Sequence, residues 1–334
     1  AAKIIPNIVR RAEAFAAISR IQATRSKGAA TKNIAKLLLL TSSIADPLKR
    51  ANLYGKSAVI QNRIGNKIGA KETLILAEKL ALGLTETKQR ETALGYIATA
   101  WAEIGDVNRA FSVLDDMGQQ NERTPALISA ATAQAKAGDS HLALETAQEI
   151  DSLRYKSVVL AKIAATQGAL EKSSDALEIL EQARNAAIDI KKPFAKDYAV
   201  SRIALTQSWV GYIRKQSDEL SAAANFANTI KDKRLRAETL WTIAGQFRRL
   251  TGSDQTNQIS TLAESATNKI KSQLSRAWMF SDLSLSYLSH GETATAWQTW
   301  RRGLKISKRI ENAWGRTRAL GKLATALITL EKSK

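Results

Sequence analysis

The feature that most constrains the fold of this chain is an internal repeat that covers most of its length. A basic residue recurs at intervals of 33 or 40 residues; counting it as position 0, a large apolar residue follows at +4 and a small one at +8. The eight basic residues are Arg50, Arg90, Arg123, Lys156, Lys196, Arg236, Arg276 and Arg316. Such self-similarity is typical of proteins that stack copies of one supersecondary unit.

Each copy has the pattern of two helices joined by a short turn. Positions +3, +4, +7 and +8 share one face of a helix, which we call helix A. A glycine at +15 is predicted to end helix A in a left-handed conformation in five copies, at Gly65, Gly105, Gly138, Gly211 and Gly291. Recurrent alanines in the following helix B allow close helix packing. The chain is therefore predicted to be all-α, a solenoid of stacked antiparallel helical hairpins.

The repeat also sets the predicted domain boundaries. Residues 47–334 form the solenoid of about eight copies, and Gly315–Glu331 supplies only a final capping helix. Residues 1–46 fit the pattern poorly, because Arg10 lies 40 residues before Arg50 but Ile18 occupies the small position. We predict an N-terminal capping hairpin there, with an exposed and mobile basic linker over 25–32.

Composition narrows the classes of function. The 334 residues include 50 Lys and Arg against 31 Asp and Glu, no cysteine and two histidines. Missing cysteines exclude disulfides and thiolate metal sites. A net charge of +19 favours acidic partners. The charge is uneven, since residues 91–151 carry 3 basic and 10 acidic side chains between two basic flanks.

Localisation rests on weaker signals. The purest apolar run, Leu37–Leu40, is four residues, far shorter than the ~20 residues that cross a bilayer. The small residues at Ala1 and Ala2 and the lack of thiols suit an exported protein of the bacterial periplasm, with the cytoplasm as the alternative.

The repeat resembles the tetratricopeptide repeat. The residues that carry the resemblance are Ile97, Ala98, Trp101, Gly105, Ala110 and Leu114, and again Leu283, Ser284, Tyr287, Gly291, Ala296 and Trp300. The resemblance covers about residues 47–334. It implies a right-handed superhelix whose concave face, lined by the A helices, holds a peptide or protein.

The positions that the resemblance places on the concave face are +2, +5, +9, +12 and +13. The candidate groove residues are Arg63, Tyr198, Trp209, Trp241, Arg248, Arg249, Trp278 and Arg318. Glu103 occupies the same position in its copy as Arg63. Aromatic residues and arginines together make good anchors for a partner. The alternative is that Trp209 and Trp241 simply pack between neighbouring A helices, as aromatic residues at helical spacing usually do.

Two sets of basic residues are candidates for binding a polyanion. The repeated basic residue lies near the core face of helix A, so we interpret it as structural, with its charged head reaching carbonyls or carboxylates at the repeat junction. A denser basic patch on the last helix B comprises Arg301, Arg302, Lys305, Lys308 and Arg309. It could contact an acidic protein, an anionic polymer or a membrane surface, or be a solvated face.

No catalytic pattern stands out. His141 and His290 lie at different positions in different copies, and neither has a second histidine at ligand spacing. The sequence therefore predicts a non-catalytic scaffold without cofactor or small-molecule substrate. Its leading partner is an acidic protein or peptide in the concave groove; the alternative is an anionic polymer, nucleic acid or cell-wall glycan, on the basic flanks.

Overall fold

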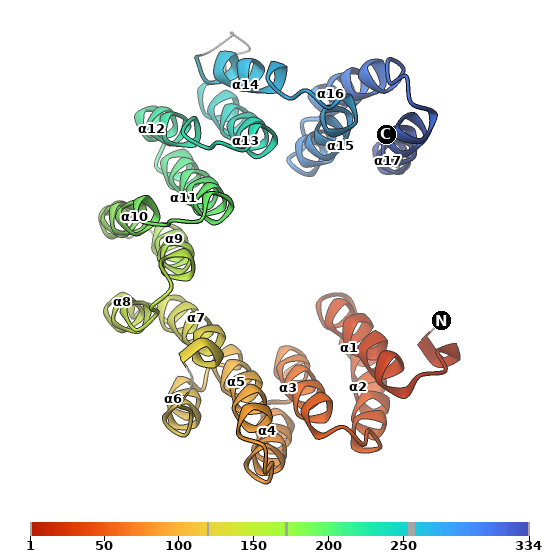
Figure 1. Cartoon of the computed structure of the whole chain (residues 1–334), viewed down its shortest axis with the longest axis vertical. Helices are drawn as coiled ribbons and strands as arrows, with labels where there is room; N and C mark the ends of the chain where they lie inside the picture. The colour runs from red at the N-terminus through yellow and green to blue at the C-terminus, as the bar shows by residue number, and fades with distance from the viewer. Residues whose placement is uncertain (1, 119, 171–172, 253–257, 333–334) are drawn as a thin grey trace. The chain divides into compact units, whose positions relative to one another are not determined.

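A computed structural model describes residues 2–118, 120–170, 173–252 and 258–332, and these ranges contain helices and no strand. The chain divides into two compact units, Ala1–Val159 and Leu160–Lys334, with the boundary inside α9 (Figure 1). All-α architecture is as predicted.

Unit 1 begins with a short 3-10 helix, η1 (Ala2–Ile4). Its α-helices are α1 (Ile8–Arg25), α2 (Lys27–Ser42), α3 (Pro47–Arg63), α4 (Lys67–Leu82), α5 (Thr87–Glu103), α6 (Val107–Asp115), α7 (Gln120–Lys136), α8 (Ser140–Gln148) and the start of α9 (Leu153–Ala169). Odd-numbered helices are the A helices and even-numbered ones the B helices. Each of α1, α3 and α5 packs against the next A helix along the chain.

Unit 2 continues the same alternation. Its helices after α9 are α10 (Ser173–Ile188), α11 (Pro193–Ile213), α12 (Ser217–Ala227), α13 (Lys233–Thr251), α14 (Gln258–Asn268), α15 (Gln273–Ser289), α16 (Thr293–Ser307) and α17 (Ala313–Glu331). The A helices α11, α13, α15 and α17 pack in sequence order. Hydrogen bonds join residues about one repeat apart, such as Ser201 to Thr239 at 2.8 Å, so neighbouring A helices run parallel and nearly in register.

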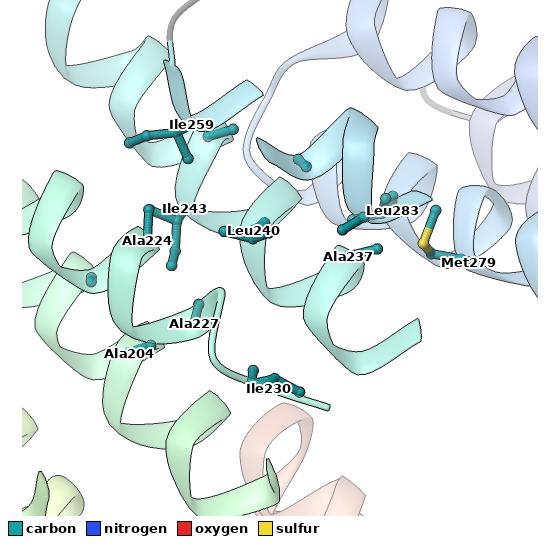
Figure 2. Packing of buried hydrophobic residues seen from close by; sticks show 14 of the residues in the cluster. Ala204, Ala224, Ala227, Ile230, Ala237, Leu240, Ile243, Ile259, Met279 and Leu283 are labelled. Carbon is teal, nitrogen blue, oxygen red and sulfur yellow. The ribbon is translucent and has the colours of Figure 1, made fainter. Parts of the chain in front are cut away.

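The small residue at +8 lies in the core, as expected, in the seven copies from Ala58 to Ser284, whereas Ala324 of α17 is exposed. In unit 2, Ala204 and Ala244 are fully buried with Leu240 and Ile243. Figure 2 shows Leu240 and Ile243 of α13 beside Ala224 of α12 and Ile259 of α14. In α17 the same face lacks a helix B, and Leu320 and Ile328 are exposed there.

Four of the five predicted turn glycines adopt the predicted conformation. Gly65, Gly105, Gly138 and Gly291 have φ values of 96°, 91°, 91° and 79°. Gly211 does not, because α11 continues to Ile213 and Lys215 takes the left-handed turn with φ 57°. A Cβ on Gly211 would lie 2.6 Å from Cβ of Glu219, so this glycine instead allows α11 and α12 to approach closely.

The N-terminal hairpin differs from the prediction in two ways. Only Ser26 separates α1 from α2, so the predicted linker over 25–32 is helical. The basic position of this copy is Arg11 rather than Arg10: its Nε donates to the carbonyl of Ile5 at 2.7 Å, as Arg316 donates to that of Ile310. With Arg11 as position 0, buried Phe15 and Ser19 occupy +4 and +8. The first copy is therefore a regular repeat spaced 39 residues from the next.

The structural interpretation of the basic position is confirmed for three of the eight residues, whereas Nε of Arg50, Arg123, Arg236 and Arg276 is buried without a hydrogen-bond partner among the described residues. Lys156 Nζ donates to the carbonyl of Gln148 at 3.0 Å, Lys196 Nζ to that of Ile188 at 2.6 Å, and Arg316 Nη1 to that of Ile310 at 3.1 Å. Each acceptor lies at or just beyond the end of the preceding helix B. A cation at this place compensates carbonyls that the helix leaves without partners.

Candidate binding groove

The A helices of unit 1 enclose a groove of about 650 Å³. Its lining comes from α1, α3, α5 and the first turns of α7, at positions +2, +5, +6, +9, +10 and +13, together with Glu122 at −1. With Arg11 as position 0, the α1 residues Glu13, Ala16, Ala17 and Arg20 fall at +2, +5, +6 and +9. The groove therefore follows one repeated face of the A helices, and its volume is in the range of ligand sites in proteins.

Position +5, at the floor of the groove, is small in three successive copies, as Ala16, Gly55 and Gly95. A Cβ on Gly55 would lie 3.5 Å from Cβ of Ala100. A Cβ on Gly95 would lie only 2.8 Å from the carbonyl oxygen of Glu122. Gly95 thus lets the backbones of α5 and α7 approach closely, and this contact positions the first turns of α7 at the groove.

Buried polar contacts hold the groove walls. The Glu91 carboxylate, on the inner face of α5, accepts a hydrogen bond from the backbone N–H of Gly118 at 3.1 Å and so fixes the approach to α7. The side-chain amide of Asn62 in α3 donates to the carbonyl of Ile104 after α5 at 3.4 Å. The first contact joins α5 to the junction before α7, and the second joins neighbouring copies, so both help to fix the lining helices relative to one another.

The cations of the groove lie on one pair of helices, and most of its carboxylates lie on the other pair. Arg20, Lys56 and Arg63 lie on α1 and α3, where Glu13 is the acidic exception; Glu103 and Glu122 lie on α5 and α7. Within the described ranges, none of these three cations forms an ion pair. Their charge is available to a ligand.

Tyr96 of α5 also lines the groove, with 40% of its surface exposed. An exposed aromatic ring beside unpaired cations can cover an apolar side chain of a ligand and hydrogen-bond through its hydroxyl. Arg63 was predicted from the sequence, whereas Arg20, Lys56 and Tyr96 were missed. Lys56 and Tyr96 occupy +6, which the resemblance did not include, and Arg20 was hidden by the one-residue shift of the first copy.

The predicted aromatic patch of unit 2 is arranged differently. Trp209 packs against α9, since a Cβ on Gly168 would meet its ring at 3.4 Å. Trp241 Nε1 donates to Oγ1 of Thr267 in α14 at 2.9 Å, and the guanidinium of Arg302 lies 5.5 Å from its ring centroid. Trp209 thus packs between neighbouring A helices, as the alternative interpretation expects, whereas Trp241 packs against the B helices α14 and α16. Tyr198 remains exposed.

Arg248 and Arg249 share one carboxylate. Each donates to Glu292 at 2.5 Å, and all three side chains are largely buried. Arg248 also lies over the ring of Tyr287. Burial raises the pKa of Tyr287, although the Arg248 charge acts in the opposite direction. The two predicted groove arginines therefore belong to an internal cluster of α13, α15 and the start of α16.

Trp278 and Arg318 do lie together. Trp278 Nε1 donates to the carbonyl of Arg318 at 3.4 Å, and the guanidinium lies 5.2 Å from the Trp278 ring centroid and 4.7 Å from that of Trp314. Trp314, which the sequence reading missed, is 65% exposed. The arginine is thus held between two indoles.

The basic patch on α16 divides into one paired residue and four exposed ones. Arg302 binds both carboxylate oxygens of Glu264 at 2.8 and 2.9 Å and lies 4.5 Å from the Phe280 ring centroid. The exposed residues, without an ion pair in the part of the chain that the structure describes, are Arg301, Lys305, Lys308 and Arg309.

The described residues include no cluster of three metal-ligating side chains and no helix long and apolar enough to span a bilayer. No family model and no curated protein matches the sequence. Among solved structures, the chain is similar to the crystal structure of Ton1535 from Thermococcus onnurineus NA1, with 18% identity over 81% of this chain and 82% of that one and a TM-score of 0.34.

Proposed function

We propose that this chain is a non-catalytic, tetratricopeptide-like scaffold that binds an extended segment of a partner protein in the groove of unit 1. The observation that carries the proposal is the combination of a small-residue floor, an exposed tyrosine and three unpaired cations on one repeated helix face. The proposal includes a right-handed superhelix and a bacterial periplasmic or exported setting, which the repeat pattern and the composition support.

The charge arrangement specifies the segment. Acidic side chains of the partner would meet Arg20, Lys56 and Arg63 on the α1 and α3 wall, and its apolar or basic side chains would meet Tyr96 and Glu103 on α5. Exposed charges of this kind contribute mainly to orientation and association rate. Apolar contact with Tyr96 and the groove floor would supply the remaining affinity.

The test is to select binders from a random dodecapeptide library on the full chain and to measure the affinity of the enriched peptides by calorimetry. Ala17 is exposed at +6, so Ala17→Trp fills the groove from an accessible position. We expect this variant to abolish binding, and Lys56→Ala combined with Arg63→Ala to weaken it by roughly tenfold.

The matched control is Ala35→Trp, at an exposed position of α2 outside the groove lining. This variant should bind the peptides as the parent does. Peptides that bind Ala17→Trp and the parent equally would place the site elsewhere and refute the proposal.

A further inference from the structure

The junctions that lead from each helix B to the next helix A in unit 2 share a second pattern. A buried isoleucine anchors each junction, at Ile190, Ile230, Ile270 and Ile310, spaced 40 residues apart. Because stacked hairpins place all such junctions at the same end of their helices, residues next to these isoleucines form one edge of the unit.

This edge is basic. Lys191 and Lys192 follow the first isoleucine, and Lys231 and Lys233 flank the turn after the second. All four are exposed, and none has an ion pair in the described part of the chain. Asp232 lies between the second pair, where its carboxylate caps α13 through the backbone N–H of Leu235.

The next two junctions carry the same kind of residue. Lys269 and Lys271 flank Ile270, and Lys308 and Arg309 precede Ile310. They too are exposed and lack an ion pair among the residues that the structure describes. We call these eight side chains the junction ridge; Lys308 and Arg309 belong also to the basic patch on α16.

The backbone beneath the ridge is held in place. Asp197, buried at the start of α11, accepts hydrogen bonds from the backbone N–H groups of Lys231 and Asp232 at 3.0 and 2.8 Å. Adjacent helices pack about 8–10 Å apart, so the junctions present cations at roughly regular steps of that size.

Unit 1 carries the opposite charge at its corresponding junctions. Asp46, Glu86, Asp116 and Asp151 lie there, with Lys49 and Lys88 as the nearby cations. The ridge is therefore a property of unit 2 rather than a consequence of the overall basic composition.

Exposed aromatic rings stand beside the ridge. Phe194 and Trp314 each lie four residues after a junction isoleucine, and 74% and 65% of their surfaces are exposed. Flat rings next to cations are the recurring elements of surfaces that bind single-stranded nucleic acids, where phosphates meet lysines and bases stack on rings.

We propose that the junction ridge binds single-stranded nucleic acid without sequence specificity, at a site distinct from the unit 1 groove. Phosphates lie along the ridge cations, and bases stack on Phe194 and Trp314. A flexible strand can follow cations at separate steps, and lysine recognises phosphate as a point charge without a required orientation.

The test measures fluorescence anisotropy of a labelled oligothymidylate of about 20 nucleotides with the full chain in 50 and 200 mM salt. If four cations contact phosphates, the slope of log K against log salt is about −2.8, a loss of roughly fiftyfold between the two conditions. The ridge variant removes one cation from each junction: Lys191→Gln, Lys231→Gln, Lys271→Gln and Lys308→Gln. We expect it to bind at least tenfold more weakly at 50 mM salt, with a shallower slope.

The control variant changes the net charge equally on α2 and α4 of unit 1. Its four exposed lysines, without ion pairs in the described ranges, are Lys32, Lys36, Lys67 and Lys79, each changed to Gln. The control should bind within about twofold of the parent, because its charges lie off the ridge. Equal losses in the two variants would show diffuse attraction only and overturn the proposal.

A second arm separates nucleic acid from other polyanions. Phe194→Ala and Trp314→Ala should each weaken oligothymidylate binding by roughly fivefold or more, and leave the binding of an abasic strand of the same length unchanged. The same ridge-dependent binding of heparin or of phosphatidylserine vesicles, with no binding of oligothymidylate, would assign the ridge to a glycan or a membrane and refute a nucleic-acid site.

Discussion

The A helices of the two units present the same repeated face but use it differently. In unit 1, positions +5 and +6 combine a floor of Ala16, Gly55 and Gly95 with exposed Lys56 and Tyr96. In unit 2, the same positions hold Trp241, whose ring packs against α14, and Asp282, which binds Lys322 at 2.6 Å. Positions that are open in unit 1 are thus filled at Trp241 and neutralised at Asp282, whereas Arg202 at +6 of α11 is exposed without an ion pair among the described residues.

The difference teaches that binding capacity in a repeat scaffold depends on what its charged groups already contact. Unit 2 has more arginine and tryptophan on this face than unit 1, yet Arg248 and Arg249 are paired with Glu292. Truncating a surface cation that has no partner affects ligands, whereas truncating a member of a buried cluster affects folding. The following variants test this distinction, starting with the largest expected effect.

Glu292→Ala should destabilise unit 2 by about 3 kcal/mol, because it leaves two largely buried guanidinium groups without their carboxylate. The measurement is urea unfolding followed by circular dichroism. The matched change in unit 1 is Glu103→Ala, which should leave the unfolding midpoint unchanged because no ion pair joins Glu103 to the described residues. Similar midpoints for the two variants would contradict the contrast between the units.

Gly95→Ala and Gly321→Ala change the same position, +5, in α5 and α17. The first should destabilise unit 1 by about 1–3 kcal/mol, since the new Cβ would lie 2.8 Å from the carbonyl oxygen of Glu122. The second meets nothing within 4 Å and should stabilise the chain by up to about 1 kcal/mol through helix propensity. Thermal unfolding of both variants gives the signs. A stabilising Gly95→Ala would mean that α5 and α7 are not in close contact.

Lys156→Met and Lys196→Met test a feature that the two units share. The basic position should stabilise unit 1 and unit 2 by similar amounts, because its side chain makes the same kind of contact in both. Each variant removes a hydrogen bond to a carbonyl at the end of the preceding helix B while keeping an apolar stem, and each should cost about 1 kcal/mol. Urea unfolding provides the measurement. A loss of oligothymidylate binding without a loss of stability would instead make these residues part of a polyanion site.

Alkaline pH should affect unit 2 through Tyr287. Its pKa is raised above the ordinary 10.0 by burial, so the folded state retains the phenol proton to higher pH than the unfolded state. The unfolded state then binds fewer protons, and stability contributed by the neutral phenol decreases as pH rises above about 10. Unfolding midpoints measured from pH 9 to 11 should fall less in Tyr287→Phe than in the parent. Identical pH dependence would show that Tyr287 ionises freely.

The helices and their order could be predicted from the sequence, because the repeat pattern depends on the local spacing of apolar and small residues that become buried. It located Arg63 in the groove and identified the role of Lys196 and Arg316 from their position alone. Gly211 was predicted wrongly because α11 is about one turn longer than the other A helices, so the left-handed residue is Lys215 instead.

The residues of the candidate site could be predicted only in part from the sequence. Whether Arg249 is free depends on Glu292, 43 residues later, and nothing in either local pattern shows that the two meet. Likewise, the groove depends on Gly95 approaching Glu122 across neighbouring copies. A one-residue shift to Arg11 concealed the contribution of α1. Such long-range pairings are properties of the folded chain.

The most direct test of the account is photo-crosslinking of a selected peptide that carries a benzophenone group, followed by mass spectrometry of the full chain. We predict adducts on the groove faces of α1, α3 and α5, around Ala17, Lys56 and Tyr96. Adducts confined to α11, α13 or α15, around Tyr198 or Trp278, would show that the exposed remainder of unit 2 binds the peptide and would contradict the assignment of the groove to unit 1.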